Sequence, residues 1–203
     1  MRRIIKIGGS MLLRDDLATA VNNWLNKHPA DQTWVVIGGG KLIDAMRELD
    51  SQHPMDPQQV HWTCVDLLTA TARFAAQRFG WPLITTQAEW EVACEYQSKI
   101  DQPTGNAPTV IAPAVFYNDG PPAICNERSN AARLKLPDDW QTTTDSIAGL
   151  LAHLANADEL VLLKSCPIPS SMSPTQLADA GIVDAAFPEI ATLLQRVHVE
   201  QLL

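Results

Sequence analysis

The sequence predicts an α/β fold built around a mainly parallel sheet. Two observations lead to this prediction. Short apolar runs alternate along the chain with segments of helical periodicity, as expected where buried parallel strands are joined by helices. Glycine clusters follow two of these runs, and ligands of open α/β sheets bind at the carboxyl ends of strands. No internal repeat, low-complexity tract or linker interrupts the pattern, so residues 1–203 are predicted to form one domain.

Five runs are predicted to be strands, because each is short, nearly all apolar and bounded by Gly, Pro or polar residues. They are Arg3–Ile7, Thr33–Ile37, Leu83–Thr86, Thr109–Ala112 and Glu159–Leu163.

Three segments carry apolar residues at helical spacing and are predicted to be helices. They are Lys41–Leu49, His61–Phe79 and Asp145–Ala155. Gly80 ends the second of these helices. The threonines before Asp145 are predicted to cap the third. Between Glu89 and Pro137 many prolines and mixed polar residues predict loops and short hairpins.

Composition excludes two classes of function. Apolar residues make up 46% of the 203 residues and charged residues 19%, which is typical of a folded globular protein. The net charge is −8, without the basic stripe of a nucleic-acid binder. No apolar run reaches the roughly 18 residues that span a membrane.

The amino-terminal segment and the cysteines predict a cytoplasmic protein. The first apolar run is too short for a signal peptide, and Lys6 interrupts it. The four cysteines lie far apart, without zinc-finger or redox spacing, and are predicted to be reduced thiols. They are Cys64, Cys94, Cys125 and Cys166.

The first candidate site is Gly8-Gly9-Ser10, which follows Lys6 at the end of the first strand. Two glycines let backbone amides approach a phosphate, and the start of a following helix is predicted to add partial positive charge. Lys6 would bring a full positive charge and Ser10 a hydroxyl. Gly9→Val should therefore impair nucleotide binding more than stability. A tight turn with a surface lysine would explain the same residues without a ligand.

The second candidate site is Gly38-Gly39-Gly40, at the end of the second strand. Three consecutive glycines exceed what a turn requires and predict close approach of the backbone to a ligand. The segment is not a P-loop, because Gly40-Lys41 lacks the upstream glycine and the following Ser or Thr. It also lacks the G-x-G-x-x-G spacing of a dinucleotide site.

The third candidate site combines Asp145, at a helix start, with Lys164, at the end of the next strand. Alone, Asp145 would be a helix-capping carboxylate and Lys164 a solvated strand end. Together with Lys6 they would form a lysine–aspartate–lysine set. Phosphoryl transfer requires phosphates held in line and neutralisation of their charge, which two lysines fixed by one carboxylate supply.

In this order the three motifs resemble those of the amino-acid-kinase family, which includes acetylglutamate, aspartate, glutamate and uridylate kinases. That family opens with K-x-G-G-S, has a glycine-rich loop after its second strand and carries an aspartate on a late helix. Lys6, Gly8–Ser10, Gly38–Gly40 and Asp145 match these positions. The resemblance covers most of the chain. It implies a three-layer α/β/α sandwich with a mainly parallel open sheet, an ATP-dependent kinase and a homodimer.

The resemblance also implies roles for individual residues. Lys6 and Lys164 would stabilise the transferring phosphoryl group, and Asp145 would orient both lysines. The predicted ATP-binding residues are Gly8, Gly9, Ser10, Thr144 and Ser165. A small phosphate or carboxylate acceptor would be held by Gly38, Gly39, Gly40, Asp44, His61 and Arg128. Capping or packing would explain His61 equally well, and solubility would explain Asp44. Mg²⁺ would be held by ATP and water, since the sequence has no metal-binding cluster.

A shorter resemblance narrows the acceptor. Residues 137–148 are similar to the P-x-x-W-x-x-T-x-D-S-I-A segment of a small subgroup. That subgroup includes the kinase of methanofuran biosynthesis, which phosphorylates an aminomethylfuran-methyl phosphate. His61-Trp62 opens its helix in a similar way. The resemblance implies a furan-type phosphate as acceptor and a diphosphate as product.

Two departures from the family keep alternatives open. Larger members carry Leu-Thr-Asp after the late strand, where this chain has Leu163–Pro167. Gly181–Phe187 stands in place of their glycine-plus-lysine nucleotide segment, and Lys164 is predicted to replace the missing lysine. The alternatives are a non-catalytic nucleotide or anion binder on the same fold, and an unrelated Rossmann-like dinucleotide domain.

Overall fold

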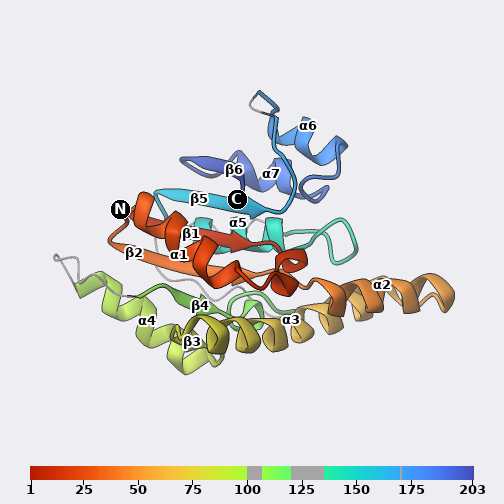
Figure 1. Ribbon diagram of the computed structural model, residues 1–203. Coiled ribbons are helices and arrows are strands. Elements are labelled where there is room, and N and C mark those ends of the chain that lie inside the picture. Colours follow the sequence, from red (N-terminus) through yellow and green to blue (C-terminus); the bar gives the residue numbers. More distant parts are fainter. Residues whose placement is uncertain (100–106, 120–134, 170) are drawn as a thin grey trace.

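Six strands form a single sheet in the computed structural model, which describes residues 1–99, 107–119, 135–169 and 171–203 (Figure 1). The strand order is β3-β4-β2-β1-β5-β6, and every neighbouring pair runs parallel. The strands are β1 (Arg2–Ile7), β2 (Gln32–Ile37), β3 (Leu83–Ile84), β4 (Thr109–Ile111), β5 (Glu159–Lys164) and β6 (Val197–Gln201).

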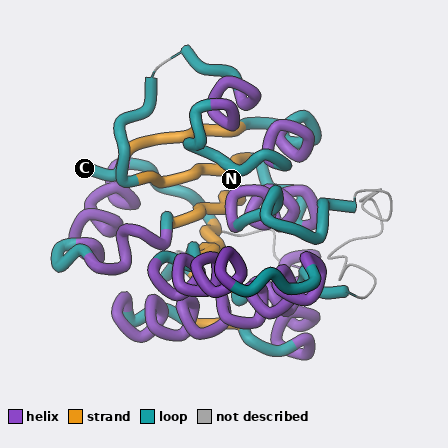
Figure 2. The backbone as a smooth tube through the Cα atoms, turned by 90° about the vertical axis from the view of Figure 1, so that its right-hand side faces the viewer, coloured by secondary structure: helices purple, strands orange, loops and turns teal. Residues whose placement is uncertain are grey.

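Helices cover both faces of this sheet (Figure 2). The α-helices are α1 (Leu17–Lys27), α2 (Lys41–Gln52), α3 (Pro57–Phe79), α4 (Gln87–Lys99), α5 (Thr144–Leu154), α6 (Pro174–Asp179) and α7 (Phe187–Ala191). Among the described residues, the 3-10 helices are η1 (Gly9–Leu13) and η2 (Pro113–Val115). The predicted α/β class with a mainly parallel sheet is confirmed.

Alternating side chains of β1 divide the interior into two cores. Ile4 packs with α5 and the first half of α3, whereas Ile5 packs with α1 and the second half of α3. This division follows from the pleat of a strand, whose successive side chains point to opposite faces. Because both faces are covered, the central strands are apolar at nearly every position, which is why they were recognisable in the sequence.

The strand register brings the candidate motifs together at one edge of the sheet. Ile7 of β1 pairs with Ile37 of β2 on one side and with Leu163 of β5 on the other. The Gly8 amide donates to the Leu163 carbonyl at 3.1 Å, and the Gly38 amide donates to the Ile7 carbonyl at 2.9 Å. The loops after these three strands therefore lie side by side.

Four expectations from the sequence need correction. The first part of the segment predicted as loops and hairpins is helical in α4 as far as Lys99, and residues 100–106 and 120–134 of that segment lie outside the described residues. The edge strand β6 was not predicted, because its residues alternate instead of forming an apolar run. No α-helix follows Ser10 directly, since η1 intervenes and α1 begins at Leu17. Cys94 is disulfide-bonded rather than reduced, because sequence spacing does not report distance in the fold.

The thiols of Cys64 and Cys166 are free, and Cys125 lies outside the described residues. Within the described part of the chain, no helix is both long enough and apolar enough to cross a membrane.

Candidate active site

Lys6, Asp145 and Lys164 form one ion-paired set at the carboxyl edge of the sheet. Lys6 Nζ lies 2.8 Å from Asp145 Oδ1, and Lys164 Nζ donates to Asp145 Oδ2 at 2.7 Å. Exposed fractions are 6% for Lys6, 4% for Asp145 and 8% for Lys164. The two lysines come from adjacent strands, β1 and β5, and Asp145 comes from the first turn of α5. This burial excludes a surface position for Lys6 and a solvated strand end for Lys164.

The three charges depend on one another. Burial acts to raise the pKa of Asp145, but the positive charges of Lys6 and Lys164 outweigh it, so this pKa lies below its usual value. Burial and the charge of Lys6 lower the pKa of Lys164, against the opposing effect of Asp145. Within the set, two ammonium groups share one carboxylate. That arrangement attracts an anion, since charges act strongly where water is scarce.

Asp184 is a neighbouring carboxylate that the sequence analysis did not single out. It accepts hydrogen bonds from the backbone amides of Thr143 and Ser146, both at 3.0 Å. It also accepts from the hydroxyls of Thr143, at 2.8 Å, and Ser146. Burial, with the negative charge of Asp145, raises the pKa of Asp184. Thr143 therefore does not cap α5 with its own side chain, and the predicted threonine cap is wrong.

The two glycine loops contact each other. A Cβ on Gly9 would lie 2.1 Å from the Gly40 nitrogen and 2.7 Å from the Gly38 carbonyl carbon. A Cβ on Gly38 would lie 2.4 Å from the Gly9 nitrogen. Gly40 also has a φ of +54°, a conformation that favours glycine. These glycines are therefore needed for loop-to-loop packing, a constraint that the expectation of ligand approach alone did not include.

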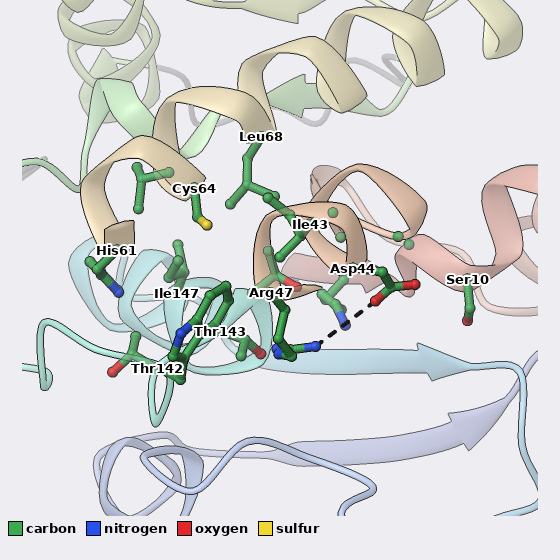
Figure 3. A pocket seen from close by; sticks show the side chains of 18 residues that line it. Ser10, Ile43, Asp44, Arg47, His61, Cys64, Leu68, Thr142, Thr143 and Ile147 are labelled. Atoms are coloured by element: carbon green, nitrogen blue, oxygen red, sulfur yellow. Dashed lines mark ion pairs between the residues drawn. The ribbon is translucent and has the colours of Figure 1, made fainter. Parts of the chain in front are cut away.

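One cavity at this edge of the sheet, called here the glycine-loop cavity, measures about 220 Å³. Figure 3 shows it between α3, which carries His61, Cys64 and Leu68, and the segment with Thr142, Thr143 and Ile147. Its polar end holds Lys6, the glycine loop and the threonines. Its apolar wall consists of Ile43, Val65, Leu68 and Ile147.

Trp140, Arg47 and Asp44, which line the glycine-loop cavity, make aromatic and charged contacts. The Trp140 ring lies 4.6 Å from the Arg47 guanidinium carbon, and its Nε1 donates to Asp50 Oδ2 at 2.7 Å. Arg47 also lies 3.9 Å from Asp44, an ion pair visible in Figure 3. Because Trp140 and Arg47 both line the cavity, these contacts hold a cation and a flat aromatic surface on its wall.

The second cavity, called here the strand-end cavity, measures about 450 Å³. Its walls are the loop after β1, the end of β5 and the turn after α6. The lining residues are Lys6, Gly8, Gly9, Ser10, Lys164, Ser165, Cys166, Pro167, Ala180, Gly181 and Ile182. Lys6, Gly9 and Ser10 line both cavities, so a group held beside Lys6 is accessible from either side. The Ser10 and Ser165 hydroxyls lie 3.1 Å apart.

The predicted binding residues divide between the two cavities. Gly8 and Ser165 line the strand-end cavity, and Asp44 lines the glycine-loop cavity with Gly38, Gly39 and Gly40. Thr144, also predicted to bind ATP, lines the glycine-loop cavity. Arg128 lies outside the described residues.

His61 lines the glycine-loop cavity but has both ring nitrogens engaged. Nδ1 lies 3.1 Å from the Asp139 carbonyl oxygen, and Nε2 lies 2.9 Å from the Tyr117 hydroxyl. Burial lowers the pKa of His61, which favours the neutral ring. A polar contact from His61 to a ligand would require one of these bonds to break.

The lining of the strand-end cavity fits the phosphate groups of a nucleoside triphosphate. The strand-end cavity offers two ammonium groups, two hydroxyls and glycine backbone, which suit phosphate oxygens. Among the described residues, no group of three or more His, Cys, Asp or Glu side chains could hold a metal ion. Both oxygens of Asp145 already contact lysines.

Comparison with solved structures identifies the fold. A uridylate kinase from Archaeoglobus fulgidus matches with a TM-score of 0.59 and 16% identity, over 99% of this chain and 91% of that one. A UMP kinase from Bacillus anthracis matches with a TM-score of 0.60 and 12% identity, over 99% and 87% of the two chains. An aspartate kinase from Synechocystis matches with a TM-score of 0.59 and 14% identity, over 98% of this chain and 38% of that one.

The chain has the amino-acid-kinase fold. No protein-family model and no curated protein matches the sequence. At these identities the solved structures establish the amino-acid-kinase fold alone.

Proposed function

We propose that the protein is an ATP-dependent kinase that phosphorylates a small anionic acceptor. The observation that carries this proposal is the buried Lys6–Asp145–Lys164 set, with Lys6 shared between two cavities. Charge neutralisation at a fixed point between donor and acceptor is what phosphoryl transfer demands of a protein. The uridylate, UMP and aspartate kinases that share the fold support the same reaction class.

In this proposal the strand-end cavity binds ATP and the glycine-loop cavity binds the acceptor. An acceptor oxygen forms a bond to the γ-phosphorus while the bond from that phosphorus to the β-phosphate oxygen breaks, leaving ADP. Lys6, which lines both cavities, and Lys164, which lines the ATP cavity, bind oxygens of the moving group. Asp145 holds both ammonium groups in place. Mg²⁺ bound to ATP supplies further charge neutralisation at the β- and γ-phosphates.

The lining of the glycine-loop cavity favours an acceptor with a compact apolar body and one anionic group. Val65, Leu68 and Ile147 offer no hydrogen bonds to the polar edge of a nucleobase, and unpaired polar atoms are costly to bury. Both nitrogens of His61 are already engaged. The polar end, with Lys6 and the backbone at the start of α2, suits a phosphate. A furan-type phosphate, giving a diphosphate, is therefore our first choice.

A panel of acceptors tests both the kinase activity and the choice of a furan-type phosphate as acceptor. The protein is incubated with ATP, Mg²⁺ and, separately, aminomethylfuran-methyl phosphate, uridine monophosphate, acetylglutamate, aspartate or isopentenyl phosphate. Products are followed by phosphorus NMR. Coupled diphosphate signals with the furan alone support the full proposal. Turnover of another acceptor removes the furan and retains the kinase. Saturable ATP binding without turnover on any acceptor favours the non-catalytic binder.

We further propose that the protein is a homodimer. Apolar side chains are exposed on α2 and α3, at 38% for Leu42, 54% for Leu49 and 51% for Phe74, and exposed apolar surface of this kind favours association. Sedimentation equilibrium at micromolar concentration tests the dimer. A mass equal to one chain would contradict it.

A further inference from the structure

Asp184 caps α5 from a distant part of the chain. Its Oδ2 accepts three hydrogen bonds, from the Thr143 amide, the Thr143 hydroxyl and the Ser146 amide, at 2.8–3.0 Å. Its Oδ1 accepts from the Ser146 hydroxyl. First-turn amides have no partner within their own helix, and the amino terminus of a helix attracts negative charge. A side chain about 40 residues away in sequence thus satisfies the start of α5.

The capped turn is the one that carries Asp145. Asp145 lies between Thr143 and Ser146 in sequence, and all of its side-chain contacts with Lys6 and Lys164 depend on where this turn sits. Ser146 is 0% exposed, so water could not easily satisfy its amide and hydroxyl if Asp184 were removed. Thr143, which makes the other two bonds, is partly buried. Hydrogen bonds to Asp184 therefore restrain the position of the carboxylate that holds both lysines.

The same residue links the walls of the two cavities. Ile182, two residues before Asp184, lines the strand-end cavity. Thr143, which bonds to Asp184, lines the glycine-loop cavity. The bonds of Asp184 are the only hydrogen bonds from side chains of residues 181–187 to α5 among those described. Movement of residues 181–184 would therefore be transmitted to the turn that carries Asp145.

We infer that Asp184 is a positioning residue for phosphoryl transfer, which it serves by hydrogen-bonding the first turn of α5 and so fixing Asp145 between the two lysines. This inference rests on the proposed kinase function. It assigns to residues 181–184 a task in catalysis beyond forming a wall of the strand-end cavity. The inference assigns this task to the hydrogen bonds, because Oδ2 accepts three of the four and an uncharged amide oxygen at that position can accept the same three.

Two substitutions separate hydrogen bonding from charge. Asp184→Asn can keep its oxygen at the Oδ2 position and retain three bonds, while its amide donates to the Ser146 hydroxyl. Asp184→Ala loses all four bonds. We expect Asp184→Ala to lower kcat at least about 30-fold with the acceptor KM changed less than about threefold, and Asp184→Asn to stay within about fivefold of wild type. Asp179→Ala, on the exposed end of α6, is the matched control.

Amide hydrogen exchange gives a readout that does not need turnover. The Thr143 and Ser146 amides should exchange faster in Asp184→Ala than in the wild type, and Asp184→Asn should restore protection. If Asp184→Ala does not fold, Ser146→Ala is used in its place for both the kinetic and the exchange measurements. Ser146→Ala removes only the hydrogen bond from the Ser146 hydroxyl to Asp184. We expect it to lower kcat less than Asp184→Ala would.

The outcomes distinguish this inference from the proposed function. A wild-type protein without turnover on any acceptor overturns the kinase, while hydrogen exchange still tests the restraint of α5. An active wild type with unchanged kcat in Asp184→Ala overturns the inference and leaves the kinase standing. A loss of thermal stability in Asp184→Ala with normal kcat per folded molecule would make Asp184 a structural cap alone. Equal losses in Asp184→Asn and Asp184→Ala would overturn the assignment to hydrogen bonding.

Discussion

Gly9 and Gly40 approach so closely that a single Cβ atom on Gly9 would lie 2.1 Å from the Gly40 nitrogen. The neighbouring atoms are backbone, which cannot rotate away as a side chain does. The loops after β1 and β2 can therefore adopt this arrangement only while both positions lack side chains.

Gly9→Ala should consequently destabilise the protein, by at least about 2 kcal/mol, rather than impair nucleotide binding selectively. Gly8→Ala is the control, since its Cβ would come no closer than 3.3 Å, to the Leu163 carbonyl oxygen. Thermal melts followed by circular dichroism measure both. A Gly9→Ala protein that melts within about 2 °C of wild type would show that the loops separate without cost.

Lys6→Ala should lower kcat by at least about two orders of magnitude, because it removes an ammonium group aimed at the transferring phosphoryl, worth about 3 kcal/mol. Lys41→Ala is the matched control, since the Lys41 side chain is 79% exposed and lies near the same loop. Steady-state kinetics on the preferred acceptor give the comparison. Near-normal turnover in Lys6→Ala would remove it from the catalytic set.

Lys164→Ala should also lower kcat strongly, by about 100-fold, if Lys164 supplies the ATP-side cation of the proposed kinase. Exposed charges rarely change activity more than a few-fold, but Lys164 is 8% exposed and bonded to Asp145. ATP affinity by calorimetry is measured alongside kcat. Unchanged kcat and unchanged affinity together would contradict both the kinase role and a binding role for this lysine.

Stability at acid pH should report on Asp145. Its pKa is lowered in the folded protein, so below about pH 4 the unfolded chain binds the proton more readily. The stability that Asp145 contributes is present above that pH and is lost as pH falls through the folded-state pKa. Asp145→Asn should therefore cost more stability at pH 7 than at pH 3, measured by urea unfolding. A cost that is equal at both pH values would contradict the ion-paired assignment.

The free cysteines should differ in reactivity. Burial raises the pKa of Cys64 to about 11, which leaves little thiolate at pH 8. Cys166 is exposed and lines the strand-end cavity. A maleimide should therefore label Cys166 and spare Cys64 in the folded protein, as read by peptide mass spectrometry, and bound ATP should slow the labelling. Cys166→Ser is the control. Labelling that ATP does not affect would place the nucleotide elsewhere.

Local patterns in the sequence predicted most of the central fold. The strands at the middle of the sheet are buried on both faces and therefore read as apolar runs, and α3 and α5 show helical stripes with clear ends. The same logic failed at α4, where prolines further along suggested loops, and at β6, an edge strand of alternating residues. β6 alternates and so lacks the continuous apolar run that makes a strand buried on both faces visible in the sequence.

The sequence by itself determined which charged residues and which glycines lie at the strand ends or begin the next helix. They are Lys6, Asp145, Lys164 and the two glycine loops. Only the tertiary structure decided how they combine. Parallel pairing of β1 with β2 and β5 places residues about 160 positions apart in contact, and this proximity makes both oxygens of Asp145 meet lysines. It also decided that Asp184 caps α5 and that the glycine loops pack on each other. Contacts of this kind depend on how elements pack in three dimensions, and no local pattern along the chain encodes them.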